Sequence, residues 1–157
     1  MLLYPKKITK KKIHMVIPSF NIIKYDHMRF GNLGIASGCE GYITSRQIES
    51  CRRILVKSLR KSKSEKTNRK VWIRVFPFLS ITKKPSAVRM GKGKGKHSFW
   101  ACPVKKGQIL FEINGLTLLE LKKISNKISV RLSMITYFTW LTVYHTKKNL
   151  LHNINNK

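Results

Sequence analysis

Apolar residues recur at helical spacing in the first half of the 157-residue chain. The repeating positions lie on one face of a helix: Ile48, Cys51, Leu55 and Leu59. Thr44 and Gln47 match a capping box, so we expect this helix to begin near Thr44. Ile43 stands where a hydrophobic staple would pack against Ile48. Cap and periodicity therefore predict the same helix.

A second amphipathic segment follows later in the chain. Thr117 and Glu120 form another capping box, which predicts a helix beginning at Thr117. Its apolar stripe is Leu118, Leu121, Ile124 and Ile128. We expect this helix to end before a last strand, which is predicted at about 130–138.

Alternating apolar and polar residues predict strands between the two helices. The segment 71–76 alternates clearly, and 98–104 and 108–113 read as two further strands joined by a short turn. Pro103 indicates that its strand lies at an edge or is bulged, since proline cannot donate a ladder hydrogen bond. Strands mixed with two helices predict an α+β fold.

The polar segments divide the chain into an arm, a domain and a tail. We expect 1–29 to be a basic N-terminal arm with the first turns, 30–138 to be a single domain, and 139–157 to be a C-terminal extension. Residues 61–70 have the composition of a flexible loop. No internal repeat is visible in the sequence.

Charge narrows the functional classes. The chain has 33 lysines and arginines against 6 aspartates and glutamates, a formal net charge of +27. So few carboxylates can hardly build a paired-carboxylate hydrolase or a carboxylate metal cage. A polyanionic partner explains the charge best, and the candidates are nucleic acid and an anionic membrane.

The remaining chemistry is sparse. Three widely spaced cysteines and five scattered histidines match neither a disulfide framework nor a zinc site, so we expect no metal and no cofactor. The longest apolar-leaning run, 134–144, is far short of the ~20 residues that a membrane helix needs. The first residues lack the apolar stretch of a signal peptide. We therefore expect neither a membrane anchor nor a small-molecule substrate.

Residues 82–97 carry the strongest functional signal. Three glycines, Gly91, Gly93 and Gly95, alternate with lysines, which disfavours both a helix and a central strand. The positive residues of this Gly/Lys loop are Lys83, Lys84, Arg89, Lys92, Lys94 and Lys96. The P-loop and dinucleotide patterns fail, because Lys96 stands where a glycine is required. A basic finger inserted into folded RNA or against tRNA is favoured over a disordered basic linker.

Two further basic segments point the same way. The N-terminal arm carries Lys6, Lys7, Lys10, Lys11 and Lys12. On the first helix, Arg46, Arg52 and Arg53 lie off the apolar face, and Glu49 can pair with Arg53 at i,i+4. The helix surface is either an ordinary solvated face or a phosphate-facing one, and the excess of one sign favours the second.

Two rival functions remain open at this point. A free-standing RNA- or DNA-binding regulator would need exposed aromatics, and the candidates are Trp72, Phe76, Phe99 and Trp100. We expect these four to pack in the core instead. A nucleotide-dependent enzyme would need a glycine loop that the sequence does not match, and no catalytic spacing is present, so we expect no enzyme.

Several blocks of sequence resemble the L-sixteen family of large-ribosomal-subunit proteins, bacterial and organellar type. The matching blocks are MLLYPKK at 1–7, GYITSRQIESCRR at 41–53, KVWIRVFP at 70–77, ITKKP at 81–85, AVRMGKGKG at 87–95 and GQILFEING at 107–115. The loop at 61–70 is longer than in bacterial members, and 139–157 has no counterpart.

The resemblance implies a fold and a role. The fold would be α+β, with two helices packed on a mixed, barrel-like sheet. The protein would be a structural constituent of the large ribosomal subunit, with large-subunit rRNA, tRNA and neighbouring ribosomal proteins as partners. It would help to position tRNA near the aminoacyl site and the peptidyl-transferase centre. A divergent mitochondrial ribosome is favoured, with a plastid or the bacterial cytoplasm as alternatives.

The charge pattern and the resemblance together assign residues. Those expected to bind rRNA are Lys6, Lys7, Lys10, Lys11, Lys12, Arg46, Arg52, Arg53, Lys70, Arg74, Lys83 and Lys84. Those expected in the tRNA-proximal loop are Arg89, Met90, Gly91, Lys92, Gly93, Lys94, Gly95 and Lys96.

Overall fold

The computed structural model describes residues 4–5, 12, 27–62, 68–91 and 93–140, which hold two helices and seven strands. In chain order these are β1 (Leu33–Ser37), β2 (Gly41–Thr44), α1 (Ser45–Lys61), β3 (Lys70–Ile73), β4 (Leu79–Lys83), β5 (Lys96–Val104), β6 (Ile109–Asn114), α2 (Leu118–Leu132) and β7 (Thr136–Trp140).

The strands form two antiparallel sheets. One has four strands in the order β3-β6-β1-β7, and the other has three in the order β2-β5-β4. The α+β class is confirmed. The mixed, barrel-like sheet is wrong: every pair is antiparallel, and β3 and β7 stay at opposite edges of their sheet instead of pairing to close it.

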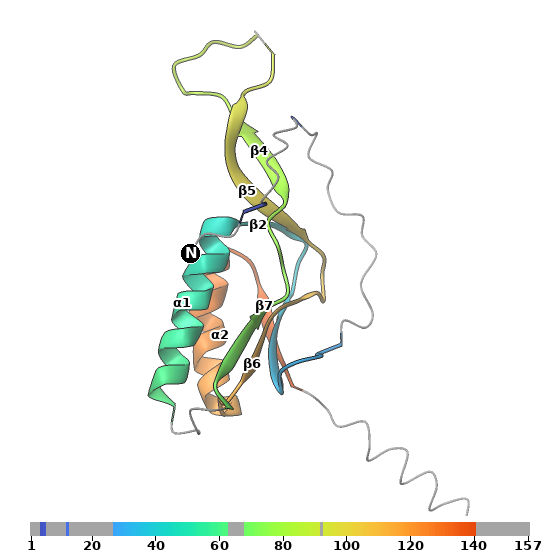
Figure 1. Cartoon of the computed structure of the whole chain (residues 1–157). Coiled ribbons are helices and arrows are strands. Elements are labelled where there is room, and N and C mark those ends of the chain that lie inside the picture. The colour runs from blue at the N-terminus through green and yellow to red at the C-terminus, as the bar shows by residue number, and fades with distance from the viewer. Residues whose placement is uncertain (1–3, 6–11, 13–26, 63–67, 92, 141–157) are drawn as a thin grey trace, which may run out of the picture.

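Both helices pack on one side of the four-stranded sheet, and Figure 1 shows them lying side by side there. The core between these layers contains the predicted apolar face of α1 together with Ile35, Phe111 and Ile113 from the sheet. Of the predicted α2 stripe, Leu121, Ile124 and Ile128 are in this core, but Leu118 is wrong: it lies in the first turn of the helix and is 50% exposed. Buried apolar area of this kind stabilises folded proteins by roughly 25 cal/mol per Å². The helices and the four-stranded sheet therefore share the hydrophobic core that stabilises the fold, and we call them the helix–sheet body.

The predicted capping boxes are both present. Thr44 Oγ1 accepts a hydrogen bond from the Gln47 backbone N–H at 3.3 Å, and Gln47 Oε1 accepts one from the Thr44 N–H at 2.9 Å. Thr117 and Glu120 make the same reciprocal pair at 3.3 and 3.0 Å. Each box satisfies N–H groups that a helix start leaves unpaired.

The second helix is longer than expected, and the last strand begins later. The apolar stripe continues from Ile128 to the buried Leu132, so α2 runs to Leu132. Ser133 then adopts a left-handed conformation, with φ 55°, and ends the helix. The predicted strand at 130–138 therefore begins at Thr136.

Pro103 lies in β5, the central strand of the three-stranded sheet. Its partner in β2 is Tyr42, whereas the pairing with β4 has already ended at Ala101. The strand is therefore paired on one side only at Pro103, as expected for a residue without an N–H donor.

Strands β4 and β5 extend as a hairpin beyond the helix–sheet body, with the Gly/Lys loop at its tip (Figure 1). We call β4, the connecting residues 84–95 and β5 the finger.

Candidate RNA-binding surface

The finger has a paired stem and a short tip. Thr82 pairs with His97 and Lys83 pairs with Lys96, so both ends of the predicted 82–97 loop belong to the strands. The unpaired tip is therefore 84–95. At the stem, Ser80 Oγ lies 2.7 Å from His97 Nδ1, and the His97 ring lies 4.6 Å from the Trp100 ring. The tip thus stands on an ordered base.

The tip depends on its glycines. Gly91 and Gly93 have φ values of 98° and 75°, which side-chain-bearing residues rarely adopt. Gly95 is required for another reason, because a Cβ there would come within 2.6 Å of the backbone of Lys83. Lys84 Nζ donates a hydrogen bond to the Gly91 carbonyl at 2.7 Å, which closes the tip on itself.

A basin of about 840 Å³ opens in the finger. The lysines that line it are Lys12, Lys83, Lys84, Lys94 and Lys96. Lys12 and Lys94 each donate a hydrogen bond from Nζ to the other's carbonyl, at 3.2 and 3.3 Å, so residue 12 of the predicted arm lies against the finger. No carboxylate is among the described residues of the lining. Such a concentration of ammonium groups suits a phosphate-rich ligand.

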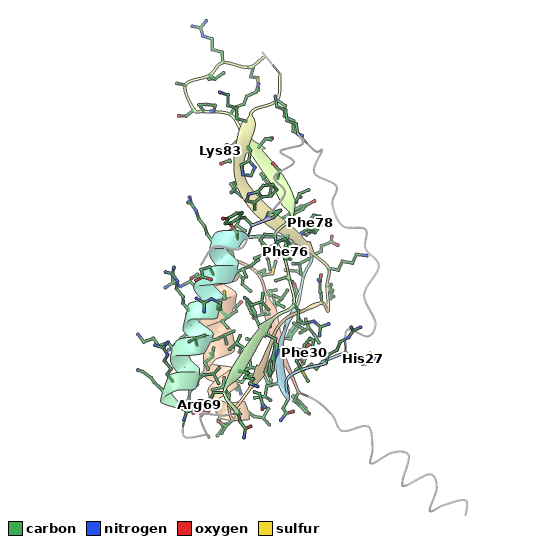
Figure 2. All side chains as sticks on the ribbon, in the orientation of Figure 1. His27, Phe30, Arg69, Phe76, Phe78 and Lys83 are labelled. Atoms are coloured by element: carbon green, nitrogen blue, oxygen red, sulfur yellow. The ribbon has the colours of Figure 1, made fainter. Side chains whose placement is uncertain are left out.

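The other predicted tip residues point to solvent. Met90 is fully exposed, and Arg89 is exposed beside it. Figure 2 shows the side chains of the tip standing away from the body of the protein, beyond the labelled Lys83. Lys92 lies outside the described residues, as do Lys6, Lys7, Lys10 and Lys11 of the arm.

On α1, the three predicted arginines differ in their surroundings. Arg46 is exposed. Arg52 binds both oxygens of the buried Glu49, at 2.8 and 2.9 Å, and Arg53 Nε reaches the same carboxylate at 3.3 Å. The hydrogen bonds from Arg52 are the main reason that the pKa of Glu49 falls to about 2. Arg53 still exposes 72% of its side chain, and Arg52 exposes 36%.

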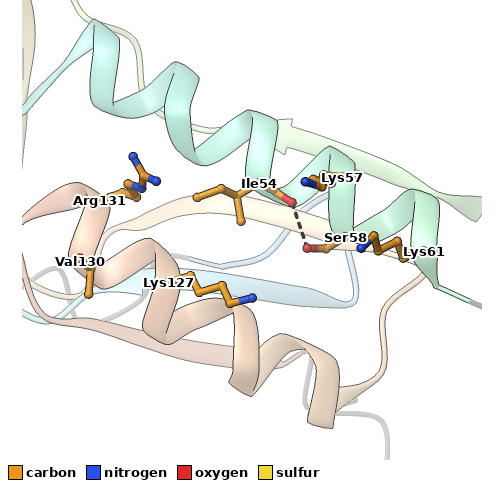
Figure 3. Close-up of a pocket in the computed structure, with 7 residues that line it drawn as sticks. All are labelled: Ile54, Lys57, Ser58, Lys61, Lys127, Val130 and Arg131. Atoms are coloured by element: carbon orange, nitrogen blue, oxygen red, sulfur yellow. Dashed lines mark hydrogen bonds between the residues drawn. The ribbon is translucent and has the colours of Figure 1, made fainter.

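A groove between α1 and α2 extends the basic surface (Figure 3). Its floor includes Ile54, whose carbonyl accepts a hydrogen bond from Ser58 Oγ at 2.9 Å. Its cationic lining residues are Lys57, Lys61, Lys127 and Arg131. The sequence analysis did not assign a role to Lys127 and Arg131, the two that belong to α2. Their i,i+4 spacing was visible, but only the packing of the helices places them opposite α1.

Lys70 and Arg74 lie elsewhere, at β3 and just after it. Lys70 is exposed. The Arg74 guanidinium forms an ion pair with Glu112, which is fully buried, and 18% of the Arg74 side chain is exposed. Arg74 therefore already has a charged partner within the protein.

The four aromatics that we expected in the core are not buried. Phe76 exposes 46% of its surface, and Trp72, Phe99 and Trp100 are half-buried. The alternation of β3 explains Trp72: Val71 and Ile73 pack against the core, so Trp72 must point to the opposite face of the sheet.

The described residues offer little reactive chemistry. Burial raises the pKa of the Cys51 thiol to about 12 and raises that of Cys102 as well, so both thiols are protonated at neutral pH. No cluster of three histidine, cysteine or acidic side chains that could hold a metal occurs in this part of the chain. Within it, neither helix is long and apolar enough to span a bilayer.

Comparison with known protein families gives one match over most of the chain. The sequence model of one family, described as ribosomal protein L16p/L10e, matches residues 4–139. The chain belongs to this family. L16p/L10e proteins are structural components and not enzymes, so the expectation of no enzyme is confirmed.

Individual relatives cover most of the chain. The large ribosomal subunit protein uL16c of Cyanidium caldarium is 42% identical over 129 residues, which is 82% of this chain and 87% of the relative. Protein uL16 of Coprothermobacter proteolyticus is 40% identical over 83% of this chain and 93% of its own length. Protein uL16 of Aeromonas hydrophila is 34% identical over 90% of this chain and 99% of its own length.

Proposed function

We propose that this protein, a structural constituent of the large ribosomal subunit, binds large-subunit rRNA through the finger and the basic faces of α1 and α2. We further propose that the finger helps to position tRNA near the aminoacyl site and the peptidyl-transferase centre. The observation that supports both parts is the projecting hairpin, whose basin brings five lysines together without a described carboxylate.

The mechanism is electrostatic and geometric. The paired stem of the finger holds the tip away from the body, where lysines can approach RNA phosphates. Cations that neutralise phosphates release condensed counterions, which favours binding without reading a base sequence. The glycines let the backbone approach RNA closely, and folded RNA is recognised mainly through its shape, phosphates and 2′-hydroxyls.

The proposed rRNA contacts fall into three groups. The first is the finger base with the arm, including Lys12, Lys83 and Lys84. The second is the outer face of α1, where Arg46 and Arg53 are exposed. The third is the groove with Lys127 and Arg131. The arm at 1–29, the domain at 30–138 and the extension at 139–157 remain our proposed division of the chain.

A free-standing regulator has no support from the family match. Location at a ribosome follows from the family, and we propose the mitochondrial ribosome. Lysine outnumbers arginine 24 to 9, which suggests an A/T-rich genome such as that of an organelle or an A/T-rich bacterium. The longer loop at 61–70 and the extension at 139–157 favour a divergent organellar ribosome. A plastid or a bacterial cytoplasm is the alternative, and fractionation of source cells with a tagged chain distinguishes them.

Charge reversal in the finger tests the proposal. Replacing Lys92, Lys94 and Lys96 with glutamate should lower the yield or the translational activity of large subunits, because repelled phosphates can no longer surround the tip. The isolated chain should keep its helical circular-dichroism signal and thermal midpoint, since the tip adds little to the core.

The matched control replaces three lysines outside both the finger and the groove between the helices, Lys105, Lys106 and Lys122, with glutamate. It changes net charge equally and should impair subunits much less. If the finger variant unfolds the isolated chain but leaves ribosomes active, the assignment of the finger is wrong.

A further inference from the structure

An aromatic pair, the exposed Phe30 and the half-buried Trp72, lies on the face of the four-stranded sheet that the helices leave uncovered. Trp72 of β3 points to this face, since its neighbours Val71 and Ile73 pack against the core. The ring of Phe30 stacks on Trp72 with 6.0 Å between ring centroids and 19° between ring planes. Phe30 nevertheless exposes 58% of its surface. The pair is therefore ordered and accessible together.

A buried carboxylate fixes the position of Phe30. Glu112 of β6 is fully buried, and its Oε2 accepts hydrogen bonds from the N–H groups of Phe30 at 2.6 Å, Gly31 at 3.0 Å and Arg29 at 3.1 Å. Gly31 has no room for a Cβ, which would come within 2.7 Å of the Ile113 nitrogen. The backbone beneath Phe30 is therefore held rigidly against the sheet.

Glu112 is ionised, which strengthens the hydrogen bonds that it accepts from the backbone beneath Phe30. Burial by itself would raise the pKa of Glu112, but the three N–H donors and the Arg74 charge outweigh it, so the pKa is lowered. The carboxylate is thus charged at neutral pH and is hidden from solvent. It repels no incoming phosphate at the surface, because its charge is met by Arg74 inside the protein.

Cationic groups surround the aromatic pair. The Arg74 guanidinium lies 5.8 Å from the centroid of the Phe30 ring. Lys70, two residues before Trp72 on β3, shares its face of the sheet by strand alternation and is exposed. Arg29 is exposed next to Phe30. Figure 2 shows Phe30 on the body of the protein, well away from the tip beyond Lys83.

We propose that Phe30 and Trp72 form a stacking platform for one unpaired base of the large-subunit rRNA. Stacked, planar side chains flanked by cations match what an unpaired nucleotide offers, namely a flat base and a phosphate. The platform rests on the proposed rRNA-binding function but adds a second mode of recognition to it. The finger meets phosphates, whereas this site would meet the base itself.

Base stacking can be separated from phosphate binding with two RNA probes. One is a ten-nucleotide oligoadenylate, and the other is an abasic ribose-phosphate oligomer of the same length and charge. In the full-length chain, Phe30→Ala should weaken oligoadenylate binding about tenfold, as expected for one stacked base, and leave the abasic oligomer unaffected. Phe30→Trp should retain binding, whereas Phe30→Leu, which lacks a planar ring, should not.

The control variant is Tyr137→Ala on β7, since Tyr137 is a 54% exposed aromatic at the opposite edge of the same sheet. It should bind both oligomers like the parent chain. An equal loss of both oligomers in Phe30→Ala would indicate a general charge or folding effect and would overturn the platform. Unchanged oligoadenylate binding would overturn it too.

Fluorescence localises the effect. The chain has three tryptophans, and the double variant Trp100→Phe, Trp140→Phe leaves Trp72 as the sole emitter. Oligoadenylate should quench Trp72 saturably and the abasic oligomer should not. Quenching that persists unchanged after Phe30→Ala is added would contradict the stacked pair as the binding surface.

The last experiment uses large ribosomal subunits assembled with this chain. Base-specific chemical probing should find one rRNA base that becomes more reactive in Phe30→Ala subunits than in the parent. If no base changes, or if Phe30 contacts a neighbouring protein or the chain's own arm, the platform is wrong. Failure of the parent chain to sediment with large subunits would instead refute the proposed function.

Discussion

At the scale of single residues, two buried carboxylates organise the arginines around them. Glu49 lies on α1 beneath Arg52 and Arg53, and Glu112 lies in β6 beneath Arg74. The protein has only six acidic residues, so two of them are committed to internal structure and cannot reduce the positive charge at the surface. Removing either should affect folding before it affects RNA binding.

The Glu49 cluster predicts acid sensitivity. A carboxylate whose folded pKa is lowered to about 2 stabilises the protein fully above its unfolded pKa of 4.5. That contribution should fall as pH drops from about 4.5 towards 2, because the unfolded chain takes up the proton first. Urea unfolding, followed by circular dichroism at several pH values between about 6 and about 2, measures this free energy of unfolding.

Glu49→Gln serves as the comparison. It should lower the free energy of unfolding at neutral pH by about 1–3 kcal/mol, because it removes charge-assisted hydrogen bonds. Its unfolding free energy should also depend less on pH in the acid range. A parent chain and variant with the same pH dependence would show that the Glu49–Arg52 pair contributes nothing to stability.

The sequence predicted the side chains whose roles are local and missed those whose roles depend on the sheet. Thr44 and Thr117 were predicted as caps because a capping box spans only four positions. The role of Glu112 could not be predicted, since its three backbone N–H donors lie more than eighty positions away in the chain. The exposure of Trp72 was missed because alternation alone does not tell which face of a strand is covered.

At the scale of elements, the finger joins a hairpin whose register shifts once, between Ile81 and Thr82, to a tip in which Gly91 and Gly93 adopt positive φ values. The strand predicted at 71–76 begins at Lys70 and ends at Ile73, because only Lys70–Ile73 pair with β6. The ends of the 82–97 loop were also misjudged, because strand pairing extends through Thr82 and Lys83 despite their polar character. The end of α2 was also misjudged, because Leu132 continues its buried stripe. Pairing partners and helix packing decide such boundaries, and neither is visible in one segment alone.

Two glycine substitutions should separate the stem from the tip. Gly95→Ala places a methyl group against the Lys83 backbone and should destabilise the hairpin by about 1–3 kcal/mol. Gly93→Ala meets no atom within 4 Å and carries only the cost of a positive φ in an exposed tip. Hydrogen exchange of the β4 and β5 amides should accelerate by about tenfold or more in the first variant only.

Equal exchange in the two variants would mean that the close approach at Gly95 does not hold the stem together. Both proteins should otherwise keep the same protection in α1 and α2, since the core in which those helices pack contains no residue of 84–95.

At the scale of the whole molecule, one sign of charge covers several separate surfaces. The finger, the outer face of α1 and the groove between the helices all present cations, on a chain with a net charge of +27. Such a distribution is typical of a protein enclosed by RNA on more than one side. The sequence indicated the amount of charge, while the fold shows where it gathers.

Binding to RNA should therefore be strongly salt-dependent. If about eight phosphates are contacted, the plot of log binding constant against log salt should have a slope near −7 on duplex-like RNA. Replacing Lys84, Lys94 and Lys96 with alanine should make the slope shallower by roughly 2 to 3, at about 0.9 per lost phosphate contact. A salt titration by filter binding measures it, and a slope unchanged by the triple variant would exclude the finger from phosphate contact.

The most direct test of the account is a cryo-electron microscopy map of large ribosomal subunits that carry this chain. The account predicts the helix–sheet body seated on rRNA, with the tip at 84–95 inserted among rRNA segments towards the tRNA-binding side. A chain absent from the particle, or one whose tip folds back on its own body away from RNA, would contradict it.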